Sequence, residues 1–281
     1  MKTKVEDVKE KKVIEKIAES ETEVNSQKSQ EEILVEQLCD GMETFEQKRQ
    51  KIFISSTAAG LEIGFSYLLI AILYTLLEGK FSLKSLPYIV AFAYPVGFIM
   101  VVLGKSILFT EQTSLLALPV LHGKRSIGEL FKLWGIVISG NLLGGAIIAF
   151  IICSVGQSMG IISTKSIADI AEHVTHQTTL TILGSAILAG WLMALLSWLV
   201  TSSNETISRI FIIYMITAIV GFAGFHHSIV GNIEVLSGLI FTDAISLGDY
   251  LTFQFTALIG NIFGGVFFVA ILKYRAFSAN F

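Results

Sequence analysis

The chain has 281 residues, of which 53% are hydrophobic and 15% charged, and its mean hydropathy is +0.69. Soluble domains carry about 25% charged residues, so this composition excludes an ordinary soluble protein, and no basic cluster suggests a nucleic-acid-binding one. The charges are segregated: residues 1–47 hold seven lysines and thirteen acidic residues, and the other 234 hold thirteen basic and ten acidic ones. The composition therefore predicts a multi-pass membrane protein.

Residues 1–47 are expected to form a charged cytoplasmic extension, without the short apolar segment of a cleavable signal peptide. Within it, Leu34, Leu38, Met42 and Phe45 recur at helical spacing. This spacing predicts an amphipathic helix that lies against the membrane or against the protein's own inner face, although a solvent-exposed helix also fits.

A helix that crosses a bilayer needs about 20 mostly apolar residues. Four segments meet this requirement: Phe53–Leu77, Leu133–Val155, Thr179–Val200 and Tyr250–Leu272. Two longer apolar segments are interrupted, Tyr88–Leu121 at Gly104–Gln112 and Ile210–Ile240 at Gly224–Asn232, and Ser163–Thr178 is a polar loop that can include a surface helix. We therefore expect a six-span pore domain over residues 48–275 and a short cytoplasmic tail over 276–281.

The basic residues predict the orientation of these spans. Six spans place both termini on one side, together with Lys48, Arg49, Lys51, Lys124, Arg125, Lys132, Arg209, Lys273 and Arg275. The opposite loops hold Lys80, Lys84 and Lys165. Loops on the cytoplasmic side of a membrane protein are enriched in lysine and arginine. We therefore expect the protein in the inner or plasma membrane, with both termini in the cytoplasm.

The third and sixth spans share a repeated string. Gly140-Asn141-Leu142-Leu143-Gly144-Gly145 recurs 120 residues later as Gly260-Asn261-Ile262-Phe263-Gly264-Gly265, and the preceding span is interrupted in both halves. Three spans per repeat require the second copy to be inverted relative to the first. Glycines four residues apart allow close helix packing, and each asparagine amide can bind backbone groups freed by the interrupted helix.

The two interruptions point to one central site, because unpaired backbone groups at membrane depth are tolerated only inside protein or along a water-filled cavity. The first contains Lys105, Thr110 and Glu111, and the second contains His226 and His227. An ionisable residue at this depth costs about 2.5–3.5 kcal/mol on insertion scales, so these residues are functional candidates.

Three of these strings resemble signatures of the formate/nitrite transporter family: Leu108-Phe109-Thr110, Phe225-His226-His227-Ser228-Ile229-Val230-Gly231-Asn232, and the Gly260–Gly265 string. The resemblance runs from about residue 40 to the C-terminus, and the stretch Ala59–Ser66 with the charged extension is similar to the family's YfdC-like branch. It implies an all-α, aquaporin-like protomer of six spans in two inverted repeats, with broken second and fifth helices. It also implies a homopentamer in the lipid bilayer that carries formate, nitrite, hydrosulfide or similar monovalent anions.

The resemblance also implies roles for individual residues. His227 corresponds to the central pore histidine, Thr110 to its partner on the first interruption, and Asn261 to a pore-facing amide. The remaining expected pore residues are Ser228, Asn232 and His226, and the expected constriction residues are Leu108, Phe109, Phe98, Tyr94 and Val220.

Four positions depart from the family's pattern. A loop lysine thought to attract anions is replaced by Val174, after Ala171-Glu172-His173. An asparagine of the fourth span is replaced by Gly190, a constriction aromatic by Val220, and the acidic residue before the central histidine by His226. The resemblance therefore does not determine the substrate.

Lys105 is the basic residue within the apolar region that lies away from the span ends. We hypothesise that it supplies the positive potential of the missing loop lysine. The alternative is a structural lysine neutralised by Glu62, Glu111 or Glu234.

An anion that crosses an apolar pore loses its hydration at a cost of tens of kcal/mol unless it is neutralised. An imidazole ordinarily titrates near ~6.5, so His227 could lend a proton to the anion, with Thr110 and Asn261 binding its oxygens. Alternatively, bulk protons neutralise the anion in the vestibule and His227 is only a polar relay.

Two other functions remain open from the sequence: an aquaporin-like channel for neutral solutes, and an ion-coupled transporter with alternating access. The sequence contains no paired Asn-Pro-Ala signature, nucleophile elbow, phosphate loop or His-x-x-x-His spacing. Cys39 and Cys153 lie far apart, one in the charged extension and one in a span. We therefore expect neither an enzyme, nor a cofactor, nor a metal site.

Overall fold

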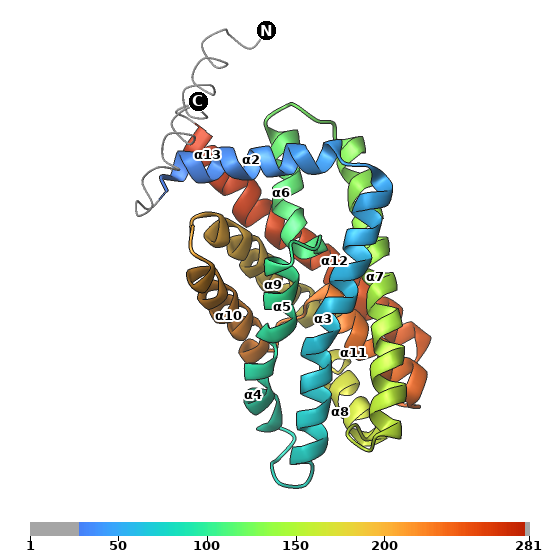
Figure 1. Ribbon diagram of the computed structural model, residues 1–281. Coiled ribbons are helices and arrows are strands. Elements are labelled where there is room, and N and C mark those ends of the chain that lie inside the picture. The colour runs from blue at the N-terminus through green and yellow to red at the C-terminus, as the bar shows by residue number, and fades with distance from the viewer. Residues whose placement is uncertain (1–27, 279–281) are drawn as a thin grey trace, which may run out of the picture.

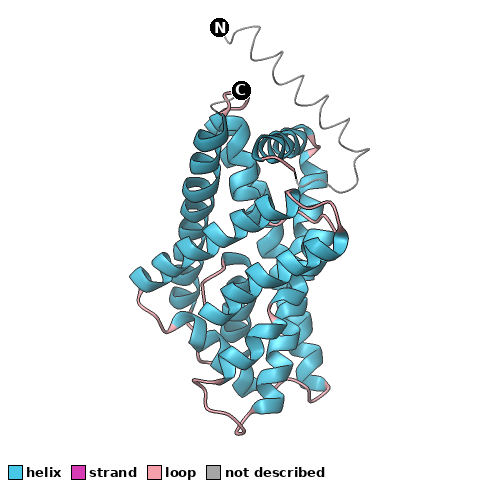
Figure 2. Ribbon diagram, turned by 90° about the vertical axis from the view of Figure 1, so that its left-hand side faces the viewer, coloured by secondary structure: helices cyan, strands magenta, loops and turns pink. Residues whose placement is uncertain are grey.

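The computed structural model describes residues 28–278, and every regular element in this range is helical (Figures 1 and 2). Six helical segments of the described chain are long and apolar enough to cross a membrane: Arg49–Leu77, Leu86–Leu103, Ile127–Ser158, Thr179–Thr201, Thr206–Ala223 and Leu247–Phe277. The first 27 residues of the predicted extension and the last three of the predicted tail lie outside the described range. The predicted all-α fold with six spans is confirmed.

The first repeat consists of α3 (Arg49–Leu77), α4 (Leu86–Val90), η1 (Ala91–Ala93), α5 (Pro95–Leu103), α6 (Phe109–Leu121) and α7 (Ile127–Ser158). The second consists of α9 (Thr179–Thr201), α10 (Thr206–Ala223), α11 (Ser228–Phe241), α12 (Leu247–Gly265), η2 (Val266–Ile271) and α13 (Leu272–Phe277). The connecting segment contains the predicted surface helix, α8 (Thr164–Thr175). Figure 1 shows α2 and α13 at one end of the molecule, here called the terminal face, and α4 and α8 at the other, the far face.

The second and fifth spans are broken as predicted, but the breaks are shorter than the polar strings suggested. Helix α6 resumes at Phe109 and α11 at Ser228, so the irregular segments are residues 104–108 and 224–227. The polar residues that follow each break therefore lie on helices. A helix at membrane depth can carry such residues because neighbouring helices supply hydrogen-bonding partners.

The repeated glycines bring the first and third helices of each half into backbone contact. A Cβ atom on Gly144 of α7 would overlap with the carbonyl oxygen of Thr57 on α3. A Cβ atom on Gly264 of α12 would likewise overlap with the carbonyl oxygen of Ile187 on α9. Close packing through small residues, predicted from the repeated string, is therefore present in both halves.

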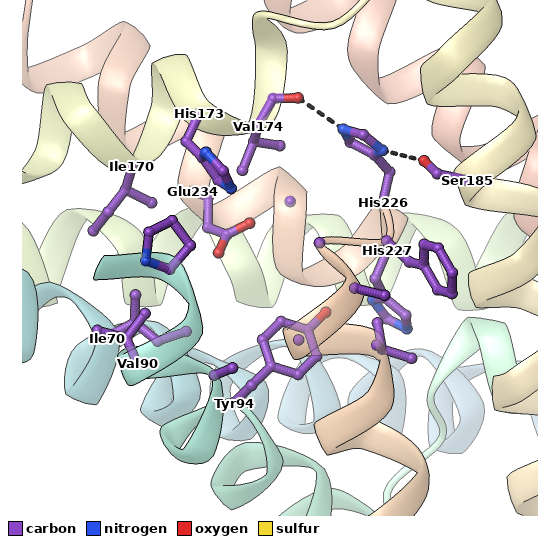
Figure 3. Close-up of a pocket in the computed structure, with 18 of the residues that line it drawn as sticks. Ile70, Val90, Tyr94, Ile170, His173, Val174, Ser185, His226, His227 and Glu234 are labelled. Carbon is purple, nitrogen blue, oxygen red and sulfur yellow. Dashed lines mark hydrogen bonds between the residues drawn. The ribbon is translucent and has the colours of Figure 1, made fainter. Parts of the chain in front are cut away.

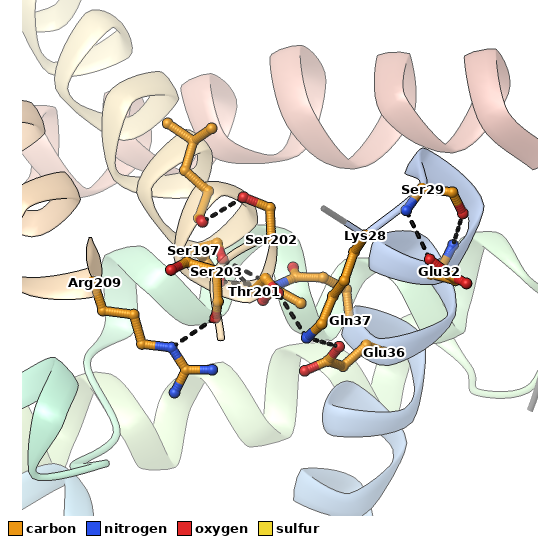
Figure 4. Close-up of polar contacts among 11 residues, drawn as sticks. Lys28, Ser29, Glu32, Glu36, Gln37, Ser197, Thr201, Ser202, Ser203 and Arg209 are labelled. Carbon is orange, nitrogen blue, oxygen red and sulfur yellow. Dashed lines mark hydrogen bonds and ion pairs between the residues drawn. The ribbon is translucent and has the colours of Figure 1, made fainter. Parts of the chain in front are cut away.

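Helix α2 (Gln30–Glu46) lies across the terminal face and packs on the protein's own helices (Figure 4). Its buried Leu34 and Leu38 belong to one apolar cluster with Leu118, Trp198 and Val269. Polar contacts fix it to the end of α9. The Lys28 Nζ donates to the carbonyl oxygen of Thr201 at 2.9 Å, and the Gln37 amide donates to the Thr201 hydroxyl at 2.6 Å.

The last span contains a π-helical segment, η2, which has no counterpart in the first repeat. It directly follows Gly264 and Gly265 and leads into α13. Its buried residues are Val269 and Ala270.

Candidate functional site

Each break is held by one asparagine from the last helix of its repeat. The Asn141 Oδ1 accepts from the Phe109 N–H at 2.7 Å, and its Nδ2 donates to the carbonyl oxygens of Ser56 and Ile107 at 2.7 and 2.9 Å. The Asn261 Oδ1 accepts from the Ser228 N–H at 2.8 Å, and its Nδ2 donates to the carbonyl oxygens of Ala186 and His226 at 2.8 and 3.0 Å. The same three kinds of backbone group are therefore satisfied in both halves.

These contacts bear on the predicted role of Asn261 as a pore-facing amide. Its side chain is completely buried, both of its polar atoms bind backbone groups, and it does not line the cavity described below. Asn261 therefore holds the break, as the sequence suggested for an amide beside freed backbone, and its contact with a substrate has no support from this geometry.

His227 and Thr110 bring the two breaks together at the centre of the molecule. The His227 Nε2 lies 2.7 Å from the Thr110 Oγ1, and both residues are buried. The Val230 N–H donates to the His227 Nδ1 at 3.2 Å, so the imidazole also caps the N-terminus of α11. Because an N–H can only donate, Nδ1 must be unprotonated, and the neutral ring carries its proton on Nε2 and donates it to Thr110.

A cavity of about 430 Å³ leads from the far face to His227 (Figure 3). It is lined from α3, α4, α8, α9, α10, the second break and α11. Six residues singled out from the sequence line it: Tyr94, Val174, Val220, His226, His227 and Glu234.

The cavity also contains polar residues that were not predicted to line it. They come from α3, α8, the loop after α8 and the start of α9, and include Tyr74, His173, Gln177, Thr181 and Ser185. Hydropathy could not identify them, because α8 lies in a segment that looks like an ordinary polar loop. The string Ala171-Glu172-His173 was the available signal, but it drew attention to Val174 rather than to the histidine.

His226 joins the second break to the ends of α8 and α9. Its Nε2 donates to the carbonyl oxygen of Val174 at 3.0 Å, and its Nδ1 accepts from the Ser185 hydroxyl (Figure 3). This histidine therefore shapes the cavity wall, with both of its nitrogens engaged.

Leu108, Phe109 and Phe98 are completely buried, and none of them lines the cavity. The ring of Phe98 meets the imidazole of His227 edge to face, with 5.2 Å between centroids. The Thr110–His227 pair thus has apolar surroundings, as an expected constriction requires. Val220 and Tyr94 lie instead on the cavity wall.

Ser228 and Asn232 are buried on α11 but do not line the cavity. The Ser228 N–H binds Asn261, and the Asn232 Oδ1 accepts from the Tyr250 hydroxyl at 2.7 Å. Both residues hold α11 against α12, so the geometry gives them a packing role.

Lys105 lies in the first break with an exposed side chain and a left-handed backbone, φ 55°. Within residues 28–278 no ion pair joins it to Glu62, Glu111 or Glu234. Its electrostatic neighbour is Asp40 of α2: burial raises the pKa of that carboxyl, and the Lys105 ammonium partly opposes the rise. The alternative interpretation, in which one of the three glutamates neutralises Lys105, therefore has no ion pair to support it among the described residues.

Comparison with known proteins agrees with this architecture. A family model described as "Formate/nitrite transporter" matches residues 31–275. The chain is 31% identical over 244 residues to the inner membrane protein YfdC of Escherichia coli (strain K12). This alignment covers 84% of this chain and 74% of that protein. Two solved structures share its fold at 22% identity: an "FNT family ion channel" with a TM-score of 0.78, covering 87% of this chain and 98% of that one, and a "pentameric formate channel with formate bound" with a TM-score of 0.68, covering 82% and 98%.

Proposed function

The chain belongs to the formate/nitrite transporter family, and on this premise we propose that it carries small monovalent anions of weak acids, or the acids themselves, across the membrane. Formate and nitrite are the first candidate substrates, because the family description names them and a structural neighbour binds formate. Membership in a family of transporters also confirms the prediction that the chain is not an enzyme.

The observation that carries this proposal is the Thr110–His227 pair at the closed end of a cavity. The pair lies among apolar side chains, where an unneutralised anion would be strongly disfavoured. The Nε2–H of a neutral imidazole can donate a hydrogen bond to a substrate oxygen in place of Thr110.

The geometry bears on where the proton comes from. For His227 to lend a proton it must first become an imidazolium, which needs a hydrogen on Nδ1. That hydrogen would displace the Val230 N–H from the ring and leave α11 uncapped. We therefore favour the second mechanism offered by the sequence, in which the anion is neutralised in the cavity and His227 serves as a fixed polar relay.

The same proposal includes the assembly and its membrane. Many large apolar side chains are exposed on the single chain, among them Phe150, Trp191, Phe263 and Phe267. These side chains fit contact with lipid and with neighbouring copies in a homopentamer. The distribution of lysine and arginine supports a cytoplasmic location for both termini, in an inner or plasma membrane.

Uptake into proteoliposomes tests the function. Formate, nitrite, hydrosulfide, acetate and lactate should be compared across pH for the wild type and for His227→Asn. We expect wild-type uptake of at least one monovalent acid anion and a marked loss in the variant. Swelling with glycerol, with no uptake of any of these anions, would instead support a channel for neutral solutes.

A further inference from the structure

Helix α11 presents a second ionisable side chain to the cavity. His227, Gly231 and Glu234 follow one another at positions i, i+4 and i+7, which lie on one face of a helix, and all three line the cavity. Seven residues of α-helix span about 10 Å, so Glu234 lies roughly that far from His227 toward the far face.

The Glu234 carboxylate is buried and has no hydrogen-bonding or ionic partner within residues 28–278. The residue is only 9% exposed, and no hydrogen bond or ion pair joins its side chain to any other residue between 28 and 278. Figure 3 shows its carboxylate directed into the cavity, between His173 and Tyr94. A carboxylate left without a partner at this burial is costly, which marks it as a functional group rather than a structural one.

The groups that face Glu234 include no basic side chain that is permanently charged. Among the residues lining the cavity are no lysine and no arginine. The titratable groups around it are Tyr67 and Tyr74 of α3, Tyr94 beside α5, His173 of α8, and His226 and His227 of the second break. On the helices behind α11 lie Cys153 of α7, within 3.5 Å of the Tyr67 hydroxyl, and Tyr250 of α12, which binds Asn232.

The approach to the cavity from the far face carries further titratable groups. An adjoining pocket shares Tyr74, His173 and Gln177 with the cavity and adds Asp169 and Glu172. The Lys165 ammonium, the nearest basic group on α8, is already paired with Glu78 and Asp169, each at 3.2 Å. Lys165 therefore neutralises Asp169, and Glu172 remains as a further acidic side chain beside the route by which protons from solution reach Glu234.

We propose that Glu234 is the proton donor of the cavity for weak-acid anions that enter from the far face. The Glu234 carboxylic acid transfers its proton to an oxygen of the anion, which yields the neutral acid and the Glu234 carboxylate. The neutral acid moves on to His227 and Thr110, and a hydronium ion from the far-face solution reprotonates the carboxylate. Each acid molecule thus carries one proton with it. This inference rests on the proposed function.

The test uses the full-length protein in proteoliposomes that contain a pH-sensitive dye. Formate is added outside, from mildly acidic to mildly alkaline pH, and both formate uptake and internal acidification are recorded. For Glu234→Gln, which keeps the size but has no transferable proton, we expect uptake at neutral pH to fall by about a hundredfold, the lower range for general acid–base transfer. For Glu234→Asp we expect partial uptake with a profile displaced to lower pH, since aspartate ordinarily ionises near ~3.9 and glutamate near ~4.3.

Glu111→Gln is the matched control, because it removes a half-buried carboxylate from the equivalent half-helix, outside the cavity. It should leave the pH profile unchanged. Wild-type rates or faster uptake in Glu234→Gln at every pH would overturn the inference. If that variant fails to assemble, an unshifted profile in Glu234→Asp would overturn it instead. A wild type that takes up none of the anions would instead refute the proposed function itself.

Discussion

The two breaks make equivalent backbone hydrogen bonds but carry side chains of different chemistry. Each is held by an asparagine through three hydrogen bonds. Leu108 caps the half-helix of the first break without a side-chain bond, whereas His227 caps that of the second with its imidazole. The second residue of the first half-helix is the polar Thr110, whereas the second residue of the other half-helix is the apolar Ile229. The repeat thus duplicates the scaffold and distributes one hydrogen-bonded pair over both copies.

The turn that enters each break shows the same contrast. The Lys105 N–H binds the Val102 carbonyl at 3.2 Å and the Ser106 N–H binds that of Val101 at 3.1 Å, and the N–H groups of Gly224 and Phe225 make the matching bonds. The left-handed residue is Gly224 in the second turn and Lys105 in the first. Glycine adopts this conformation freely, whereas a lysine there costs about 1–2 kcal/mol. Retaining a lysine at a strained position fits a role for its ammonium group.

The largest effect is expected from removing an asparagine. Asn141→Leu and Asn261→Leu each leave three backbone groups unpaired, at about 1–3 kcal/mol per group, so both variants should lose folded protein to a similar extent. Thermal unfolding in detergent and recovery of the oligomer measure this. Ser139→Ala, on an exposed position of α7, is the control. If only one of the two leucine variants lost folded protein, the two asparagines would not be equivalent.

The next largest effect concerns the pair that joins the breaks. Thr110→Val leaves the His227 Nε2–H without an acceptor, which costs about 1–3 kcal/mol and should reduce formate uptake by about tenfold or more. Thr110→Ser, which keeps the hydroxyl, should restore most of the uptake. Ile229→Val changes the equivalent position of the second half and should have little effect, so equal losses in both valine variants would contradict the assigned asymmetry.

A smaller effect separates the two left-handed turns. Gly224→Ala should destabilise the protein by about 1–2 kcal/mol, and Lys105→Gly should stabilise it by about 1 kcal/mol. Lys105→Gln keeps the backbone strain, so it should leave stability unchanged but lower anion uptake. Thermal unfolding and uptake, measured on the same preparations, distinguish these results. Unchanged uptake in Lys105→Gln would remove the case for anion attraction by this residue.

The smallest effect concerns the contact of Lys105 with α2. Burial raises the pKa of Asp40, followed by the nearby Glu36 and Glu43 carboxylates, while Lys105 partly offsets the rise. The contribution of Asp40 to docking is therefore fully present below its ordinary pKa, near ~3.9, and is lost as the pH rises through the raised value. Relative to the intrinsic rate of base-catalysed exchange, the amides of α2 should be less protected against hydrogen exchange at neutral than at mildly acidic pH. Asp40→Asn should weaken this dependence, and an equally steep dependence in that variant would contradict the assignment.

The sequence predicts the scaffold of this protein well because its signals are repetitive. Apolar runs of membrane length, a glycine–asparagine string that occurs twice, and a break before each copy define six spans and their inversion. The lengths of the breaks were overestimated, because hydropathy does not distinguish a polar loop from a helix whose polar residues face other helices. Asn232, bonded to Tyr250, is such a case.

The site was predicted less completely. His227 and Thr110 were identified through their likeness to a family signature, and the structure brings them together. Glu234 was considered as one of three possible partners of Lys105, since both are charged residues in apolar surroundings. It lies in the far-face cavity, and no ion pair joins it to that lysine. Sequence composition shows that a charge is within the membrane region but does not show from which side it is reached.

The π-helical segment of the last span contributes side chains to the apolar cluster on which α2 packs. A π turn holds about one residue more than an α turn, so every side chain beyond it is rotated by about 100° from the course of an unbroken α-helix. Val269 and Ala270 of this segment lie in one apolar cluster with Leu34 and Leu38 of α2. Deleting a single residue between 266 and 271 should therefore turn Val269 and Ala270 away from this cluster and loosen the packing beneath α2. The length of this segment therefore determines which side chains the last span presents to the apolar cluster beneath α2.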